Sequence, residues 1–564
     1  MISEKNKILA VLAFAFLLRV VGIGFGLPSL YHQDEPIIVN HALSIGAGGW
    51  NTHFFVIPPF TIYLLFMAQA LFFVIGKLLG VFGSPSDFAL MFMKDPSTVY
   101  LIGRFLLGVC FGTATVWVLW LSSRRFFGER VAFWAALFLA VLPMHVQHSH
   151  YIYADIPLTF AVTLTFFVLF LILEKPSSVN YACFGALLGW AASIKYTALY
   201  FAPVLLVVHL MAQKKEWCRL PQLLKLVLAG VCCVVLFLLL APFSLLDSKN
   251  FLGQLFHQSA AEGFSGFTHH MTYSIVGGTG ILFTVLAIFG LFVLMRAFRS
   301  RGIVVVTFLL SYYFVNVYFS QRFARYMLPL TPLLALLAAV ALESLRPTLK
   351  HQRGWVFFIT LILGGELLLP SIYSDLLFLG TDTRTECTKW FHDHVEPGTV
   401  IAVDNRFFAP HLPSSEAQIR EKYDQLGTSE KDAVRKKRLD YLLQASVGGE
   451  GYAVYQLVPD IKQATSPFLF LGPFVREDWE DVKRIRARYI VIHYSDLDET
   501  PLRLLRALSG KSTLVRSFSP YWEPSRRLSL DPEASTAAPH LPVEIFSRKS
   551  LGPYLEVYRI EGLE

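Results

Sequence analysis

Residues 156–173 read IPLTFAVTLTFFVLFLIL, a run without a charged side chain that is closed by Glu174 and Lys175. A helix of this length is about as long as a bilayer core is thick, roughly 30 Å. Lipid offers the backbone no hydrogen-bond partner, so a spanning run must pair its own N–H and C=O groups as a helix. The run therefore predicts a transmembrane helix.

Similar runs recur along the first two thirds of the chain. Of the 564 residues, 54% are hydrophobic and only 16% are charged, and the mean hydropathy is +0.51. Soluble domains carry about 25% charged residues, so we expect an all-α polytopic membrane bundle. The further runs lie at 8–27, 58–80, 98–121, 131–147, 181–212, 223–246, 277–295, 302–320, 327–345 and 354–372.

Loop charges set the expected orientation. If 58–80 crossed the membrane, the basic loop 122–130 would lie outside, against the positive-inside rule. We therefore expect 58–80 to lie along the outer surface, within an outer loop with interfacial helices over 28–97. The run 181–212 is too long for one crossing and predicts two helices that meet near Lys195. Together these choices predict about 11 crossings with a cytoplasmic N-terminus.

The composition changes after residue 372, where charged residues and turn signals become frequent. We expect 1–372 to be the membrane domain and 373–564 to be a soluble, extracytoplasmic α/β domain. Two of its predicted strands, 400–404 and 489–494, have the pattern of a buried parallel sheet. Further strands are predicted at 468–471 and 554–558, and helices at 386–394 and 429–444.

Asp34-Glu35-Pro36 is the first of four polar groups that the predicted orientation places on the outer face. Adjacent carboxylates near a membrane are costly unless they are paired, solvated or bound to a metal. One interpretation is structural, with Asp34 as the cap of a helix and Glu35-Pro36 in its first turn. The other is a general base that takes a proton from an acceptor hydroxyl.

The second group, at 143–157, holds three histidines and Asp155. No HExxH-like frame accompanies His145, His148 and His150, so we do not expect a metal site. The mixture of aromatic and polar side chains suits a sugar or a lipid headgroup, with Asp155 as its ionised member. The six cysteines also lack any CxxC or Cys/His spacing, which favours buried packing roles.

Cations make up the third and fourth groups. Lys195 is either a lysine that reaches from apolar surroundings toward water or a contact for a phosphate. Arg322 and Arg325 lie on the expected outer side, where an anionic ligand explains them better than topology does. Arg19 and Arg104 add to the same positive surface, which predicts a site for a phosphorylated lipid. The basic clusters between apolar runs follow the positive-inside rule, so we exclude nucleic acid.

The order of these motifs resembles the GT-C superfamily of polyprenyl-phosphate-sugar glycosyltransferases, and within it glycosyltransferase family 39. The resemblance covers roughly residues 8–345. It implies transfer of a hexosyl or pentosyl group from a polyprenyl-phosphate carrier to an acceptor on the outer face. The motifs are Arg19, Asp34-Glu35-Pro36, Pro58-Pro59, Arg104, Arg124–Gly128, His148-Ser149-His150, Asp155-Ile156-Pro157, Gly185–Tyr196 and Arg325–Pro329.

The resemblance also implies roles for single residues. Asp34 resembles the catalytic carboxylate that activates the acceptor, with Glu35 orienting the site and Asp155 as a second acidic residue. Lys195 and Arg325 would hold the carrier phosphate during an inverting displacement, without a metal cofactor. The remaining candidates for binding the substrate or the carrier phosphate are Arg19, Arg104, His148, His150, Arg322 and Tyr326.

Some features depart from the family pattern. The chain lacks the β-trefoil of eukaryotic protein mannosyltransferases, which disfavours a protein acceptor and favours a bacterial inner membrane. The acceptor stays open among a glycan, a lipid and a protein. The C-terminal domain is expected to cover the active site or to select the acceptor. The main alternative is a polytopic transporter or lipid flippase without transferase activity, although the sequence lacks the internal repeat usual in transporters. A receptor or scaffold is the other alternative.

Overall fold

The computed structural model forms two compact units. One unit contains Met1–Ile23, Asp34–Ala70 and Tyr100–Asp375, and the other contains Gly24–Gln33, Leu71–Val99 and Leu376–Glu564. The C-terminal unit thus includes two stretches from the N-terminal part of the chain. The structure describes residues 4–255, 265–318, 322–346, 353–405, 408–446, 451–459, 473–494, 504–506, 508–531, 533 and 540–562.

Helices build the first unit, and some of them run on into the second. They are α1 (Glu4–Val20), α2 (Glu35–Gly48), α3 (Phe60–Leu78), α5 (Ser97–Gly103), η1 (Arg104–Cys110), α6 (Phe111–Phe127), α7 (Glu129–Ala140), α8 (Pro143–His148), α9 (Asp155–Glu174), α10 (Ser178–Ile194), η2 (Tyr196–Phe201), α11 (Ala202–Gln213), η3 (Lys214–Glu216), α12 (Leu220–Leu240), α13 (Phe243–Leu246), α14 (Ser248–Leu255), α15 (Ser265–Thr268), η4 (His269–Val276), α16 (Gly277–Thr279), α17 (Ile281–Ala297), α18 (Arg299–Val317), η5 (Ala324–Leu330), α19 (Thr331–Leu345) and α20 (Arg353–Leu379).

Among the described residues, 8 helical segments are long and apolar enough to cross a membrane, or up to 9 with one bent pair. This confirms a multi-pass helical membrane protein. The count of about 11 crossings stays a prediction, as does the surface position of α3, which passes the same length test. The segments are Phe60–Leu78, Ser97–Phe127, Asp155–Glu174, Tyr196–Glu216, Leu220–Leu240, Arg299–Val317, Ala324–Leu345 and Ile359–His394, and the bent pair is Gly266–Thr279 with Ile281–Ala297.

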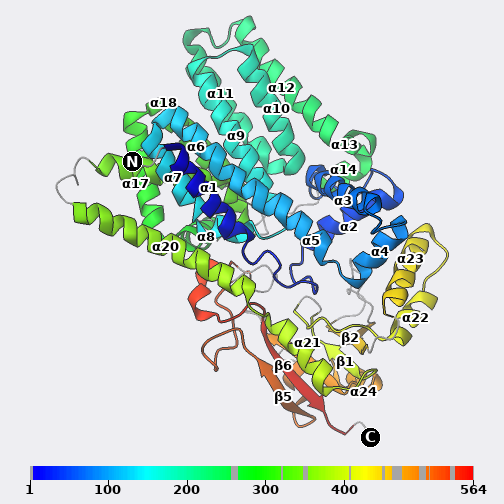
Figure 1. The fold of residues 1–564 in the computed structure, drawn as a ribbon. Helices are drawn as coiled ribbons and strands as arrows, with labels where there is room; N and C mark the ends of the chain where they lie inside the picture. Colours follow the sequence, from blue (N-terminus) through cyan, green and yellow to red (C-terminus); the bar gives the residue numbers. More distant parts are fainter. Residues whose placement is uncertain are drawn as a thin grey trace. The chain divides into compact units, whose positions relative to one another are not determined.

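The run 181–212 divides at Lys195, as predicted. Lys195 has an extended backbone between the end of α10 and the start of η2, and α11 follows. Both α10 and α11 pack against α9, so the four helices α9 to α12 lie side by side (Figure 1). The break leaves Lys195 beside the first turn of α9.

Two glycines allow α10 to approach α12 closely. A Cβ atom on Gly185 would lie 2.0 Å from the Ala229 carbonyl oxygen, and one on Gly189 would lie 2.2 Å from that of Cys233. Small residues four apart on one face let helix backbones meet in this way, as is usual in membrane bundles.

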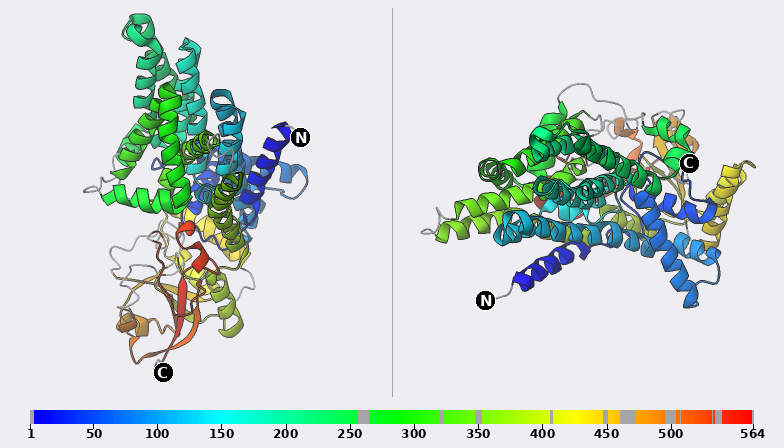
Figure 2. Two further views of the ribbon diagram at one scale, coloured as in Figure 1. Left: turned by 90° about the vertical axis from the view of Figure 1, so that its left-hand side faces the viewer. Right: turned by 90° about the horizontal axis from the view of Figure 1, so that it is seen from above.

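The centre of the bundle is aromatic and aliphatic. Phe166 of α9, Phe201 of η2 and Phe308 of α18 stack or meet edge to face, with ring centroids 4.4–5.2 Å apart. Elsewhere in the bundle α1 packs along α6 and α7 (Figure 2). The three rings join α9, whose first residue is Asp155, to η2 and α18.

The second unit contains a mixed sheet with the strand order β3-β2-β1-β4-β6-β5. The neighbouring pairs β3–β2, β2–β1 and β1–β4 are parallel, whereas β6 is antiparallel to both β4 and β5. The remaining elements of this unit are helical. The elements are α4 (Pro85–Lys94), α21 (Thr383–His394), β1 (Val400–Val403), α22 (Glu416–Asp424), α23 (Glu430–Ala445), β2 (Ala453–Val458), β3 (Phe474–Arg476), α24 (Trp479–Arg484), β4 (Tyr489–Tyr494), β5 (Ser512–Phe518), η7 (Leu541–Val543), η8 (Ile545–Ser547) and β6 (Tyr554–Ile560).

The parallel pairing of β1 with β4 confirms the predicted parallel sheet, in the register Ile401 to Tyr489. The expected strand at 554–558 and the two expected helices also form, as β6, α21 and α23. The expected strand at 468–471 lies outside the described residues. The sequence reading missed β2, β3 and β5, of which β3 is very short and β5 is mostly exposed.

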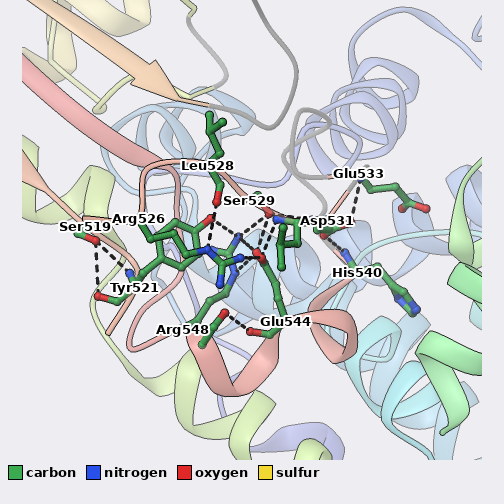
Figure 3. Close-up of polar contacts among 12 residues, drawn as sticks. Ser519, Tyr521, Arg526, Leu528, Ser529, Asp531, Glu533, His540, Glu544 and Arg548 are labelled. Atoms are coloured by element: carbon green, nitrogen blue, oxygen red, sulfur yellow. Dashed lines mark hydrogen bonds and ion pairs between the residues drawn. The ribbon is translucent and has the colours of Figure 1, made fainter. Parts of the chain in front are cut away.

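A buried carboxylate organises the loop between β5 and β6 (Figure 3). Glu544 accepts hydrogen bonds from Ser529 Oγ at 2.6 Å, from Arg548 Nε at 2.8 Å and from the Leu530 backbone N–H at 2.9 Å, and it also pairs with Arg526. Burial by itself raises the pKa of Glu544, but the charge of Arg548 and these hydrogen bonds bring the pKa below its ordinary value. The network holds this loop together through ionised groups.

Candidate functional site

Asp34 and Arg325 form an ion pair in the first unit. Arg325 Nη2 lies 3.3 Å from Asp34 Oδ2, and the side chains are 7% and 27% exposed. Asp34 occupies the cap position of α2, but its side chain makes no capping hydrogen bond. The geometry therefore disfavours the interpretation of Asp34 as a helix cap. The Asp34 carboxylate faces Arg325, and part of the Asp34 side chain is exposed.

Asp155 and Lys195 form a second pair beside the first. Lys195 Nζ donates to Asp155 Oδ1 at 2.7 Å, and Asp155 is 1% exposed at the start of α9. The other oxygen, Oδ2, is buried and has no hydrogen-bond partner in the described structure. Lys195 also lies 4.4 Å from the centroid of the Tyr326 ring. Lys195 is thus held by a carboxylate and a ring, which does not fit a lysine that merely reaches for water.

Tyr153 connects the two ion pairs. The Arg325 guanidinium carbon lies 4.8 Å from the Tyr153 ring centroid. Burial raises the pKa of the Tyr153 hydroxyl, and the nearby charge of Arg325 lowers it while those of Asp34 and Asp155 raise it further. Tyr153 therefore stays neutral, and both carboxylates act on the same phenol, so the structure brings Asp34, Asp155, Lys195 and Arg325 together.

Glu35 points away from this cluster toward Arg104. Arg104 donates from Nε and Nη2 to the two Glu35 oxygens at 2.8 and 2.7 Å, and both side chains are 0% exposed. Glu35 Oε1 also accepts the backbone N–H of Ile152 at 3.0 Å. Binding of the carrier phosphate by Arg104 stays a prediction, and it would require the phosphate to displace the buried Glu35 carboxylate. The pair fixes the loop that carries Tyr153 and Asp155.

Arg19 donates hydrogen bonds to backbone carbonyl groups. It donates to the carbonyl oxygens of Ala15, Leu139 and Ala140 at 2.8, 3.1 and 3.0 Å, and it lies 2.9 Å from His145 Nδ1. It is 0% exposed. These contacts tie α1 to the end of α7, and the phosphate contact of Arg19 stays a prediction.

The histidines of the second motif lie inside the bundle. The two ring nitrogens of His150 lie 3.0 and 2.8 Å from the carbonyl oxygens of Val146 and Val21. The ring of His148 is buried against Tyr151. Both rings lie against groups of the bundle in this structure, and a role of His148 and His150 in substrate binding stays a prediction.

Arg322 lies in another place than Arg325. It acts electrostatically on His269 and His270 of η4, near the bend between α16 and α17. Among the expected binding residues, Lys195, Arg325 and Tyr326 lie together with Asp34 and Asp155.

The segment that follows Asp34 and α2 makes hydrogen bonds to more distant parts of the chain. Asp247 accepts from Asn51 at 2.9 Å and lies 2.9 Å from His53 Nδ1. Hydrogen bonds from Asn51 and Asn250 lower the pKa of Asp247 to about 2, so its charge persists at any physiological pH. The Tyr196 hydroxyl donates to the Phe55 carbonyl oxygen at 3.0 Å, next to Lys195. These contacts join the loop to the segment that follows α10.

The paired charges suit an anionic ligand that meets a hydroxyl compound. Arg325 and Lys195 supply donors for phosphate oxygens, and Asp34 supplies a carboxylate for a proton. In the described ranges no group of three or more His, Cys, Asp and Glu side chains could hold a metal ion. Sequence reasoning missed Tyr153 and Phe323, although both stand within two residues of a charged residue that it singled out, Asp155 and Arg325.

Comparisons with known proteins concern the family and the fold of the chain. A family model described as dolichyl-phosphate-mannose-protein mannosyltransferase matches residues 88–242, a segment that includes Asp155 and Lys195. No curated protein sequence matches the chain.

Solved structures show what the fold is similar to. ArnT from Cupriavidus metallidurans bound to undecaprenyl phosphate matches with a TM-score of 0.50 and 14% identity, over 100% of this chain and 99% of that one. The apo state of ArnT matches with a TM-score of 0.49 and 14% identity, over 90% and 95%. The oligosaccharyltransferase of Archaeoglobus fulgidus with Zn and sulfate matches with a TM-score of 0.43 and 13% identity, over 98% and 88%.

The family-model match and the shared fold confirm the resemblance that the motifs indicated: the chain is similar to the GT-C superfamily and, within it, to glycosyltransferase family 39.

Proposed function

We propose that this protein is a membrane glycosyltransferase that moves a sugar from a polyprenyl-phosphate carrier to an acceptor on the extracytoplasmic face. The observation that carries the proposal is the convergence of two carboxylates, Asp34 and Asp155, with two cations, Lys195 and Arg325. The undecaprenyl phosphate held by ArnT, which has a similar fold, supports the choice of carrier. The loop charges support the outward orientation. The lack of a β-trefoil is the reason why we favour a bacterial inner membrane.

The chemistry follows from the two kinds of charge. Asp34 takes the proton of an acceptor hydroxyl, whose oxygen attacks the anomeric carbon of the sugar. The bond between that carbon and the carrier phosphate breaks, and the phosphate leaves with the electron pair. Lys195 and Arg325 bind the negative charge that develops on the leaving phosphate. The attack from the opposite face inverts the anomeric configuration.

Sugar transfer by the purified protein in detergent tests this proposal. Radiolabelled polyprenyl-phosphate sugars serve as donors, and Asp34→Asn is compared with the wild type. Loss of a general base lowers the rate by about 100-fold or more. Glu129→Gln is a matched control, because Glu129 is exposed and pairs only with Arg124 among the described ion pairs. Equal turnover by Asp34→Asn would remove Asp34 from the mechanism.

A second comparison separates transfer from transport. A protein that carries lipids across the membrane without chemistry would move the labelled donor between leaflets of a vesicle and release neither sugar nor free carrier phosphate. Absence of turnover with every donor, together with such movement, would replace the proposal with a transport function.

A further inference from the structure

Arg325 lies between two aromatic rings that the proposed reaction does not use. Its guanidinium carbon is 3.9 Å from the Phe323 ring centroid and 4.8 Å from that of Tyr153, while Tyr326 is more distant at 5.9 Å. Guanidinium groups bind to aromatic faces through cation–π attraction and stacking, most strongly where water is excluded. With a side-chain exposure of 7%, Arg325 meets that condition.

The contact of Arg325 with Asp34 is weaker by comparison. The separation of 3.3 Å exceeds the 2.7–2.9 Å typical of charge-assisted hydrogen bonds. Arg325 Nε is buried and has no hydrogen-bond partner within the described part of the chain. The position of the guanidinium is therefore set more by the rings than by the carboxylate, and its N–H donors are not all committed.

We propose that Tyr153, together with Phe323, is a positioning residue that holds Arg325 so that the guanidinium can change partner from Asp34 to the carrier phosphate without moving. A phosphate binds a guanidinium through two parallel hydrogen bonds, which a single long contact to Asp34 does not match. Cation–π contacts with the rings use none of the guanidinium N–H groups as conventional hydrogen-bond donors, so the same clamp serves both partners.

The exchange couples donor binding to activation of the base. A carboxylate that keeps an arginine as its partner accepts a proton less readily than one that is released from it. When the phosphate takes over Arg325, Asp34 becomes available for the acceptor hydroxyl. This inference rests on the proposed function and adds an order to it, in which the donor binds before the acceptor loses its proton.

Three variants separate the ring of Tyr153 from its hydroxyl group. Tyr153→Leu and Phe323→Leu each remove one ring of the clamp, whereas Tyr153→Phe keeps the ring and removes only the hydroxyl. Tyr181→Leu is the control for loss of a buried ring, because Tyr181 is 0% exposed and hydrogen-bonds His209 in the bundle. All four are compared with the wild type by thermal unfolding in detergent.

Binding of undecaprenyl phosphate in detergent is measured first, since it needs no turnover, and is followed by KM and kcat for a polyprenyl-phosphate sugar. Loss of either ring weakens binding and raises the donor KM by about tenfold, the size of one desolvated cation–π contact. In Tyr153→Phe, the affinity for undecaprenyl phosphate and the donor KM stay within about threefold of wild type. Tyr181→Leu lowers only the unfolding temperature.

Two results would overturn the inference. Wild-type affinity in Tyr153→Leu would show that the ring does not position Arg325, and an equal defect in Tyr153→Phe would assign the effect to the hydroxyl. If the wild type itself neither binds undecaprenyl phosphate nor turns over a donor, the proposed function fails, and the clamp fails with it. If the wild type binds undecaprenyl phosphate and the ring variants bind it equally well, the clamp fails and the proposed function does not.

Discussion

Glu35 and Arg104 form a two-point ion pair in which both side chains are fully buried, although the adjacent Asp34 faces a different arginine. Removing one partner of a buried pair leaves an uncompensated charge, which costs about 3–5 kcal/mol. We therefore expect Glu35→Gln to lower the unfolding temperature in detergent strongly, while Asp34→Asn leaves it almost unchanged. Glu129→Gln, which breaks an exposed pair worth at most about 1 kcal/mol, is the control. Equal unfolding temperatures for Glu35→Gln and wild type would contradict this assignment.

Tyr31 and Arg384 connect α21 to the residues that lead into Asp34. The Arg384 guanidinium carbon lies 3.9 Å from the Tyr31 ring centroid, and the Tyr31 hydroxyl is 2.8 Å from Thr385 Oγ1. Arg384→Met removes the contact with the Tyr31 ring and should misplace the segment that leads into Asp34. Because catalysis depends on the position of Asp34, we expect kcat to fall about tenfold, with less effect on donor KM. Steady-state kinetics check this, with Arg420→Met on the exposed face of α22 as control. An unchanged kcat would show that α21 does not position the loop.

Gly185 and Gly189 set the distance between α10 and α12. A leucine at either position would place its Cβ within 2.2 Å of a backbone oxygen, so the helices must separate, at a cost of about 1–3 kcal/mol or more. We expect Gly185→Leu and Gly189→Leu to lower the yield of monodisperse protein on size exclusion. Gly230→Leu in α12 is the matched control, because a Cβ there meets no atom within 4 Å. A normal yield for the α10 variants would show that the helices can move apart.

Glu544 makes the stability of the second unit depend on pH. Its pKa in the folded protein lies below the ordinary value of 4.5, so its contribution is complete above about pH 4.5 and is lost as the pH falls further. Glu544→Gln should lower the unfolding temperature at pH 7, and the difference from wild type should shrink in acid. Thermal unfolding followed between pH 7 and pH 3 measures this. A difference that stays constant with pH would show that the charge of Glu544 is not what stabilises the loop.

The proposed reaction is expected to proceed without a metal ion. Asp34 and Asp155 each pair with their own cation and not with each other, which leaves little need for a divalent ion to neutralise them. Treatment with EDTA followed by dialysis should leave the transfer rate within about twofold of the untreated enzyme. Full loss of activity that Mg²⁺ or Mn²⁺ restores would replace this expectation with a metal-dependent mechanism.

Several features of the fold and the site were readable from the chain. Local patterns predict the apolar runs, the break at Lys195 and the pairing of β1 with β4. The length of a helix and the burial of a strand depend on the hydrophobicity of residues that are close in the sequence. The sequence could not separate the arginines by role. Arg104 and Arg325 look alike in a membrane segment, and only their partners, Glu35 and Asp34, distinguish a buried support from a candidate ligand contact.

The apolar runs are enough to predict that this protein crosses a membrane many times, since a backbone in lipid can satisfy its hydrogen bonds only within each run. The sequence also determined which carboxylates and cations were available. The tertiary structure alone decided which of them meet, because Asp34, Tyr153, Lys195 and Arg325 lie in four separate segments whose packing brings them together. Charges separated by hundreds of residues interact only after the helices have packed, and that packing depends on contacts such as those of Gly185 and Gly189.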